Sequence, residues 1–402
     1  MTVEFRIGRR RHRLLFAGTI VALLVTGSAL AVGSQAFGWF TVSEAPQQVP
    51  PIVLSDISFV KGDRLHLPGR RDQRLAHPLL APLLGTDAPV AVSSPNGRYV
   101  TYHSWEGRTP LLRVHDLRDG SDHLLARGAQ TVAWGADGRI AYFQADHARY
   151  AAGPYLGKIV VRTLTTPSTA WTHRAGVYQA VAWAGGRLLI EVRRCVFPQC
   201  THDPKPGIYV LAPGGRLSRL PLSGISALSP DGHYAIGSFL PVAGQDSPSP
   251  FVRLVDIARR RVLATIDLPK LARAAGYPST AFAAGIQRAA WRGNEIAATS
   301  SFGDSSAIVF LRVKNPPLHI DDVLQLPPTT LPARYGPFLG APSFLGHGTD
   351  RIVLAVNGAG GGNGVVTAVL SCERHTRSCV RGGRLRQRQW FATLENPSRP
   401  LG

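Results

Sequence analysis

The four cysteines of the chain occur as two local pairs, Cys195 with Cys200 and Cys372 with Cys379. Each pair follows a run of strand-forming residues and brackets a spacer of turn-like composition. Paired cysteines at the base of a loop usually form a disulfide when the protein folds outside the cytoplasm. Loop closure over rings of about six and eight residues would stabilise the fold by roughly 2 to 2.5 kcal/mol per bond. We predict these two local disulfides.

Zinc binding is the alternative chemistry for these residues. His202 follows the first pair and His375 lies within the second, so each group could supply three zinc ligands. Neither group has the paired Cys-x-x-Cys spacing of a zinc module, and an oxidising compartment would remove the thiolates. The redox state of the compartment in which the chain folds therefore decides between disulfides and zinc binding. We predict disulfides and no metal site.

Few other residues are spaced for catalysis. The sequence has no Gly-x-Ser-x-Gly elbow and no His-Glu-x-x-His motif. The glycine-rich run 358–364 lacks the Gly-Lys-Ser/Thr ending of a phosphate loop and is predicted to join two strands. Asp321 and Asp322 are adjacent, and neighbours on a strand point to opposite faces, so shared acid–base work is not expected. We predict no catalytic or cofactor-binding residues.

The N-terminal region has the composition of a membrane segment. Arginines at positions 9, 10, 11 and 13 precede an uncharged apolar stretch from Leu14 to Gly33. As a helix this stretch would be about 30 Å long, which matches the hydrocarbon layer of a bilayer. Because flanking arginines stay in the cytoplasm, we predict that the chain after Gly33 lies outside it.

This apolar stretch is either a retained signal anchor or a cleaved signal peptide. Ala29-Leu30-Ala31 provides a small-x-small cleavage site, with Val32 as the new N-terminus. The length of the stretch favours retention, as do Trp39 and Phe40, which are suited to a membrane interface. We predict the anchor, and secretion after cleavage is the alternative.

The formal net charge is +20 at pH 7, and arginine supplies most of it. An excess of arginine over lysine is typical of a GC-rich coding sequence. The electric field of the net positive charge still attracts anionic neighbours. Six arginines gather near the C-terminus: Arg374, Arg377, Arg381, Arg384, Arg386 and Arg388. We interpret them as a solvated edge, with an anionic lipid or cell-wall contact as the alternative. Nucleic acid is not an expected partner, because an export signal precedes this region.

A tight turn between two alternating apolar runs recurs every 40 to 60 residues or so along the chain. Proline presets the backbone for such a turn, Asp or Asn bonds to its own backbone, and glycine takes the left-handed position. The motif occurs at Ser94-Pro95-Asn96-Gly97, Gly135-Ala136-Asp137-Gly138, Ala184-Gly185-Gly186 and Ser229-Pro230-Asp231-Gly232, with weaker versions at 292–294 and 348–350. The flanking runs are predicted to be half-buried strands.

This repeat resembles the TolB-like and WD40-like β-propellers, in which a Ser-Pro-Asp-Gly turn joins the first two strands of each blade. The turn at 229–232 matches fully and the turn at 94–97 nearly so. The resemblance covers roughly residues 85–385 and implies an all-β fold of four-stranded blades. We identify six units, and strand-like runs at 52–54 and 63–67 either form a seventh or close the ring. One helix is predicted at 268–275, ended by Gly276. A pair of β-sandwich domains is the alternative.

These observations divide the chain into a cytoplasmic tail (1–13), a membrane segment (14–33), a linker (34–52), a propeller (53–390) and a C-terminal tail (391–402). The function they favour is a binding or scaffold module at the outside of a bacterial membrane. Its partner would be an envelope protein or an anionic wall or lipid surface. The alternative is an extracytoplasmic propeller enzyme, a hydrolase or lyase acting on a sugar, lactone or peptide. The sequence specifies neither the ligand nor the oligomeric state.

Overall fold

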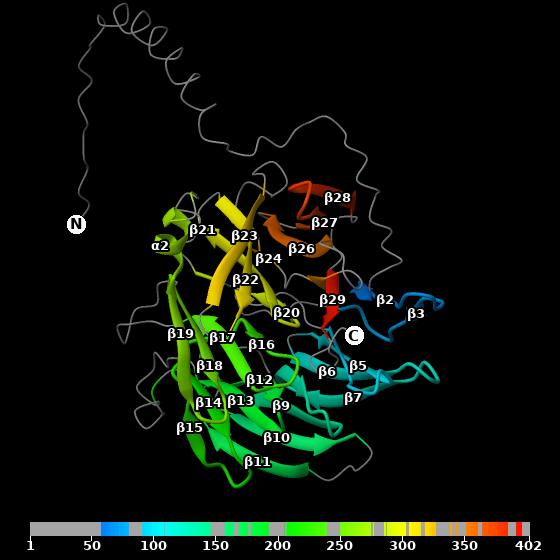
Figure 1. The fold of residues 1–402 in the computed structure, drawn as a ribbon. Helices are drawn as coiled ribbons and strands as arrows, with labels where there is room; N and C mark the ends of the chain where they lie inside the picture. Colours follow the sequence, from blue (N-terminus) through cyan, green and yellow to red (C-terminus); the bar gives the residue numbers. More distant parts are fainter. Residues whose placement is uncertain are drawn as a thin grey trace, which may run out of the picture. The chain divides into compact units, whose positions relative to one another are not determined.

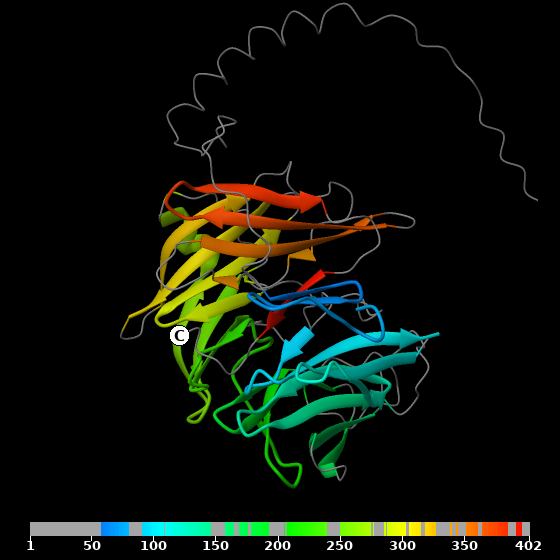
Figure 2. The ribbon, with the colours of Figure 1, turned by 90° about the vertical axis from the view of Figure 1, so that its right-hand side faces the viewer.

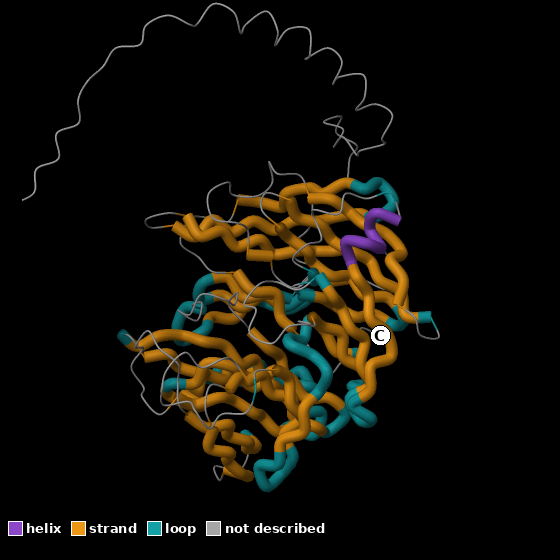
Figure 3. Tube along the Cα trace, turned by 90° about the vertical axis from the view of Figure 1, so that its left-hand side faces the viewer, coloured by secondary structure: helices purple, strands orange, loops and turns teal. Residues whose placement is uncertain are grey.

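The computed structural model describes most of the chain after residue 57. The described residues are 58–79, 91–107, 109–145, 157–164, 169–175, 178–192, 205, 207–238, 250–274, 276, 285–286, 288–302, 305–314, 318–326, 338–339, 343–344, 351–360, 364–384 and 391–395. Almost all of them lie in strands or tight turns (Figure 3). No helix among them is long and apolar enough to cross a membrane, and the stretch from Leu14 to Gly33 lies outside them.

The strands form seven blades, and within each blade they are named from the innermost strand outward (Figure 1). Blade 1 contains β29 (Phe391–Glu395), β1 (Phe59–Lys61), β2 (Arg64–His66) and β3 (Gln73–Arg74). Blade 2 contains β4 (Ala91–Ser93), β5 (Tyr99–Glu106), β6 (Thr109–Asp116) and β7 (Asp122–Arg127). Blade 3 contains β8 (Ala129–Trp134), β9 (Arg139–Ala145), β10 (Gly157–Thr163) and β11 (Thr169–Ala175).

Blades 4 to 7 continue this order along the chain. Blade 4 contains β12 (Tyr178–Ala184), β13 (Arg187–Val192), β14 (Gly207–Leu211) and β15 (Leu217–Arg219). Blade 5 contains β16 (Ala227–Leu228), β17 (Tyr234–Ser238), β18 (Phe251–Asp256) and β19 (Arg261–Asp267). Blade 6 contains β20 (Ala289–Arg292), β21 (Glu295–Phe302), β22 (Ser305–Val313) and β23 (Leu318–Leu326). In blade 7, β24 (Phe338–Leu339) and β25 (Ser343–Phe344) both pair with β26 (Arg351–Gly360), followed by β27 (Gly364–Glu373) and β28 (Ser378–Arg384).

β29, the last of the described strands, completes the first blade. β29 pairs antiparallel with β1, where Ala392 lies opposite Val60, and parallel with β4, where Leu394 lies opposite Ala91 (Figure 2). This pairing leaves no free strand edge at the junction of the two chain ends. The seventh unit considered from the sequence therefore exists, and it includes the predicted run at 63–67. Residues 391–395, assigned from the sequence to a tail, form this closing strand.

The hydrophobic core lies between blades. Six clusters of buried side chains each join two consecutive blades, from blades 1 and 2 to blades 6 and 7. Strand β9 shows the reason, because alternate side chains of a strand point to opposite faces of its sheet. Ile140 and Tyr142 pack toward blade 2, whereas Ala141 and Phe143 pack toward blade 4. The alternating side chains of one strand therefore contribute to the hydrophobic core on both faces of its blade.

The outermost strand carries a bulge in five of the blades. Between the third and fourth strands the register slips by one residue in blades 2, 3, 5, 6 and 7. The extra residues are Leu125, Ala170, Leu263, Asp321 and Gly383. A bulge twists an edge strand and hinders pairing with another chain. The repeat therefore includes an edge-protecting feature that no motif of the sequence indicates.

One short helix, α2 (Leu268–Ala274), follows the outermost strand of blade 5. The Asp267 side chain accepts a hydrogen bond from the Lys270 N–H at 3.0 Å, which caps the helix. Gly276 follows with φ +81° and donates its N–H to the Arg273 carbonyl. The helix predicted at 268–275 is confirmed.

Two sets of turns lie at the same end of the ring. In an antiparallel blade, the turn between strands one and two lies beside the turn between strands three and four. In blade 2, the Leu117 N–H donates to the Arg98 carbonyl at 2.8 Å, and in blade 5 the Ile257 N–H donates to the His233 carbonyl at 3.0 Å. We call this end of the propeller, with both sets of turns, the turn face.

Candidate functional site

Short polar networks hold the turns of the turn face. In blade 2, the Ser94 hydroxyl donates to the Asn96 Oδ1 at 2.7 Å and accepts the Tyr99 N–H at 2.9 Å. Gly97 closes the turn with φ +65°. Blade 5 repeats the arrangement with Ser229, Asp231, Gly232 and Tyr234. The turns predicted at 94–97, 135–138, 184–186, 229–232 and 292–294 all join the first two strands of a blade, and the turn predicted at 348–350 lies outside the described residues.

Aspartates at the ends of third strands bind arginines of the turn face. Arg98 donates to both carboxylate oxygens of Asp116, at 2.7 and 3.0 Å from Oδ2 and 3.3 Å from Oδ1. This hydrogen bonding lowers the pKa of Asp116 against the opposing effect of burial. In blade 5, Arg259 binds Asp256 at 3.0 Å, and the pKa of Asp256 is lowered chiefly by the Arg259 N–H. These carboxylates are therefore held ionised by their own blade.

A buried polar network joins blades 1 and 2. The Nδ1 of His115, whose side chain is fully buried, lies 3.0 Å from Asp122 Oδ2, and its Nε2 lies 2.6 Å from the Gln73 side-chain oxygen. The Tyr102 hydroxyl donates to Asp122 Oδ1 at 2.7 Å, and the Ala76 N–H donates to Oδ2 at 2.8 Å. Burial alone would raise the pKa of Asp122, but the bonds donated by these partners lower it. The same burial raises the pKa of Tyr102.

An open depression of about 560 Å³ lies over one side of this network. It is lined by Asp63, Arg74, Leu75, Ala76, Pro78, Gly120 and Asp122. The two Asp122 oxygens already accept three hydrogen bonds from the protein. The carboxylate therefore serves to fix blade 1 against blade 2.

Asp122→Asn is expected to destabilise the fold by about 3 kcal/mol, because it replaces an acceptor of three bonds with a partial donor in a buried site. The pKa of Asp122 is lowered in the folded state, so its stabilising effect is present above its unfolded pKa and is lost as pH falls through the folded value. The wild type should therefore lose stability below about pH 4, and the variant should lose less over that window. Urea unfolding as a function of pH measures both effects.

Asp119→Asn is the matched control, because Asp119 is exposed and its side chain accepts the Ser121 N–H of the same turn. It should cost less than about 1 kcal/mol. Equal losses in the two variants would contradict a structural role for the buried network.

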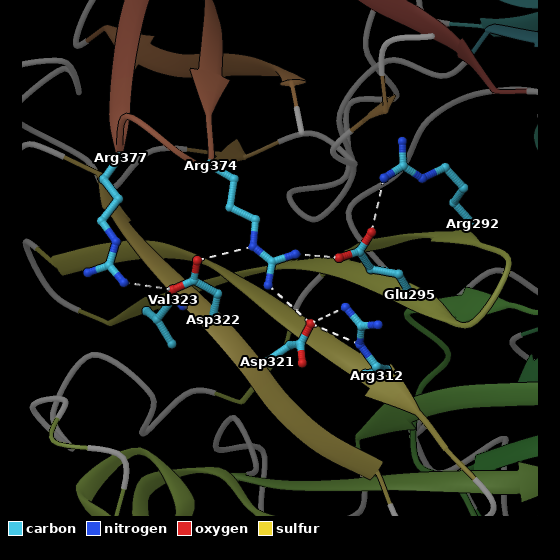
Figure 4. Close-up of polar contacts among 8 residues, drawn as sticks. All are labelled: Arg292, Glu295, Arg312, Asp321, Asp322, Val323, Arg374 and Arg377. Carbon is cyan, nitrogen blue, oxygen red and sulfur yellow. Dashed lines mark hydrogen bonds and ion pairs between the residues drawn. The ribbon is translucent and has the colours of Figure 1, made fainter. Parts of the chain in front are cut away.

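Arg374 lies at the centre of a second polar cluster, between blades 6 and 7 (Figure 4). Its guanidinium donates to Glu295 Oε1 at 2.5 Å, Asp321 Oδ2 at 3.1 Å and Asp322 Oδ2 at 3.1 Å. Its carbon lies 4.5 Å from the centre of the Phe310 ring, and the side chain is 15% exposed. Arg292, Arg312 and Arg377 bind the same three carboxylates from the outside.

The bulge in blade 6 explains how Asp321 and Asp322 reach one arginine. Phe310 lies opposite Asp322 and Leu311 lies opposite Ile320, so Asp321 is the extra residue. A bulge interrupts the alternation of side chains. The expectation that the two carboxylates point to opposite faces is therefore wrong. The pKa of Asp321, which burial would raise, is lowered by hydrogen bonds from Arg312 and Arg374, as suits a structural ion pair.

Arg374→Gln should cost about 3 to 5 kcal/mol, because it leaves partly buried carboxylates without their shared cation. Arg377→Gln is the control from the same turn, since Arg377 is 37% exposed and lies 3.5 Å from Asp322. It should cost less than about 1 kcal/mol. Urea unfolding of both variants measures the difference, and similar midpoints would show that Arg374 does not join the two blades.

One of the two predicted disulfides lies within the described residues. Cys372 and Cys379 lie directly opposite each other on β27 and β28 and form a disulfide, with their Cα atoms 4.0 Å apart. Cys195 and Cys200 lie outside the described residues, so their disulfide stays a prediction. No group of three metal-binding side chains occurs within the described ranges.

Other predicted features fall on blade 7. Residues 358–360 of the glycine-rich run form the end of β26 and Gly364 begins β27, so the run joins two strands as predicted, and 361–363 lie outside the described residues. Arg374 and Arg377 bind carboxylates of blade 6 and are not a solvated edge. Arg381 and Arg384 belong to β28, and Arg386 and Arg388 lie outside the described residues. The sequence does not indicate either polar cluster, since the contacts that join the two blades link residues 42 to 79 positions apart in the chain.

Comparison with known proteins gives no information about chemistry. No family model and no curated protein matches the chain. Solved structures with similar folds include TolB from Acinetobacter baumannii, with 14% identity and a TM-score of 0.39 over 64% of this chain and 61% of that one. The β-propeller domain of the Trilobed protease from Pyrococcus furiosus has 12% identity and a TM-score of 0.45 over 83% and 85%. A prolyl endopeptidase has 14% identity and a TM-score of 0.45 over 95% and 56%.

The chain spans only 61% and 56% of the lengths of the TolB and endopeptidase chains. At these identities no activity transfers, and the fold assignment rests on the strand pairing of this chain. The protein is a seven-bladed β-propeller. The β-propeller fold that the resemblance of its repeat implied is confirmed by this strand pairing.

Proposed function

We propose that the protein is a binding or scaffold module tethered to the outer side of a bacterial cytoplasmic membrane. The observation that carries this proposal is that the carboxylates of the propeller accept hydrogen bonds and ion pairs from its own side chains. Among the described residues, every carboxylate with a shifted pKa has it lowered: Glu106, Asp116, Asp119, Asp122, Asp231, Asp256 and Asp321.

This direction suits carboxylates that have a structural role as acceptors within the ring. A general acid acting near neutral pH needs a raised pKa, whereas these carboxylates are held ionised by neighbouring donors. The ring built with their help presents many exposed turns, which is the form that loop-mediated binding requires. The tether and the side of the membrane come from the sequence, because the arginine cluster at 9–13 precedes the apolar stretch 14–33.

Surface labelling of intact cells tests the location. Lys158→Cys places a thiol at an exposed position of β10 in blade 3. A membrane-impermeant maleimide should label this variant in intact cells, and the labelled chain should stay in carbonate-washed membranes. The wild type is the control for labelling of the native cysteines. Labelling only after lysis would contradict the proposal, and labelled protein in the medium would support secretion.

A further inference from the structure

Two arginines of the turn face have a backbone conformation that normally requires glycine. Arg260 has φ +55° and Arg377 has φ +51°, and they are the non-glycine residues with positive φ in the described part of the chain. Each is the fourth residue after the acidic residue that ends a third strand, Asp256 or Glu373. In blade 2 the equivalent position after Asp116 is Gly120, with φ +73°.

Arginine at this position is disfavoured by the local fold. A left-handed conformation is strained for a residue with a Cβ, and it is free of that strain for glycine. Strain that is kept at an exposed turn points to a use for the side chain. Arg260 is exposed, and it lies between two further exposed arginines, Arg259 and Arg261.

The turn face carries a surplus of exposed positive charge. Arg118, Arg187, Arg216, Arg260, Arg261 and Lys314 are exposed at turns or strand ends of blades 2, 4, 5 and 6. None of the six forms a salt bridge with a described residue. Carboxylates at this end are fewer: Asp116, Asp137 and Asp256 bind other arginines. The exposed Asp119 and Asp231 accept backbone N–H groups.

The chain enters the propeller at this same face. Phe59, the first residue of β1, lies opposite Thr393, near the end of β29. β29 runs parallel to β4, and β4 leads into the turn at 94–97, so the start of β1 is at the turn face. Some 25 residues separate Gly33 from Phe59, and a random-coil chain of that length would span about 30 Å on average.

We propose that the turn face lies against the anionic headgroups of the membrane that holds the tether, with Arg260 and Arg261 among its contacts. This proposal rests on the proposed tethering and adds an orientation and a lipid partner to it. Short linkage to the bilayer keeps the basic face at a high effective concentration near the headgroups. Each basic residue near an anionic bilayer should raise the ratio of docked to undocked protein roughly fivefold.

Depth-dependent quenching in proteoliposomes tests the orientation. The full-length protein is reconstituted in phosphatidylcholine vesicles with or without phosphatidylglycerol, and lipids with a headgroup quencher are included. A fluorophore is placed through His233→Cys on the turn face of blade 5, or through Ala274→Cys on α2 at the opposite end of that blade, both exposed positions. Labelled wild type supplies the background.

The fluorophore at position 233 should be quenched in the phosphatidylglycerol vesicles and released by high salt, while that at 274 should not be quenched. Arg260→Gly with Arg261→Gln should lower the docked-to-undocked ratio by more than tenfold. Arg260→Gly also removes the backbone strain, so its thermal midpoint should not fall, which separates the lost charge from a lost fold. Lys270→Gln with Arg273→Gln, on exposed positions of α2, is the matched control and should leave quenching unchanged.

Equal quenching at the two positions, or none at position 233 in anionic vesicles, would overturn the proposal and leave a wall polymer or an acidic protein as the partner of this face. Protein that does not float with the vesicles would instead show that the tether itself is absent. The two failures are therefore distinct.

Discussion

Gly232→Ala is expected to destabilise the propeller by at least about 3 kcal/mol, in the range seen for overpacked sites. A Cβ at this position would lie 2.3 Å from the Gly185 nitrogen and 2.9 Å from the Ala184 carbonyl carbon. Both atoms belong to the backbone of the neighbouring turn in blade 4, so no side chain can move aside. The φ of +69° adds the strain of a left-handed alanine.

Gly97→Ala is the matched control, because Gly97 occupies the same position of the same motif in blade 2. Its φ is +65°, and an added Cβ would meet no atom within 4 Å. This variant should cost only about 1 kcal/mol from backbone strain. Urea unfolding of both variants isolates the contact between blades 4 and 5, and equal costs would show that the two turns do not approach each other as closely as described.

Removal of residues 391–402 is expected to abolish most of the stability of the propeller, which for a domain is about 5 to 15 kcal/mol. The truncation deletes β29, which pairs with β1 on one side and with β4 on the other. Both strands would then present free edges to other chains, and aggregation should follow. Circular dichroism melting and light scattering measure the two consequences.

Removal of residues 396–402 alone is the control, since it ends the chain just after β29. This shorter truncation should melt as the wild type does. If the longer truncation also kept a wild-type melting transition, β29 would not be the strand that closes the ring.

The repeat could be predicted from the sequence because its information is local. Each turn combines residues within six positions, such as Ser94, Asn96 and Gly97, and their chemistry specifies the turn without any tertiary partner. The alternating runs on either side indicate strands for the same reason. The helix at 268–274 was predictable because Gly276 ends it.

The closing strand and the two polar clusters could not be predicted in this way. β29 is five residues long, carries no turn motif and is specified by its pairing with residues more than 300 positions earlier. Arg374 is one of many arginines in the sequence, and only the bulge at Asp321 brings both of its aspartates to one side. The network at His115 depends in the same way on Gln73 in another blade.

The positions of the exposed basic side chains on the turn face therefore follow from the topology of the blades more than from the turn motif. The turn motif is a structural element, and the groups free for binding are the basic side chains that the turns expose. Arg260 stands out only when the turns of different blades are compared, because blade 2 has Gly120 at the position where blade 5 has Arg260. The six C-terminal arginines form a conspicuous cluster in the sequence. Two of them, Arg374 and Arg377, bind carboxylates of blade 6 and so join two blades.

The most direct test of a tethered propeller that folds outside the cytoplasm is the intact mass of the chain from washed membranes, after alkylation without reduction. We predict a chain that retains residues 14–33, lacks four hydrogens because of the two disulfides and carries no alkyl group. A soluble chain that begins at Val32 would contradict the tether, and a chain with four alkylated cysteines would contradict the oxidising location.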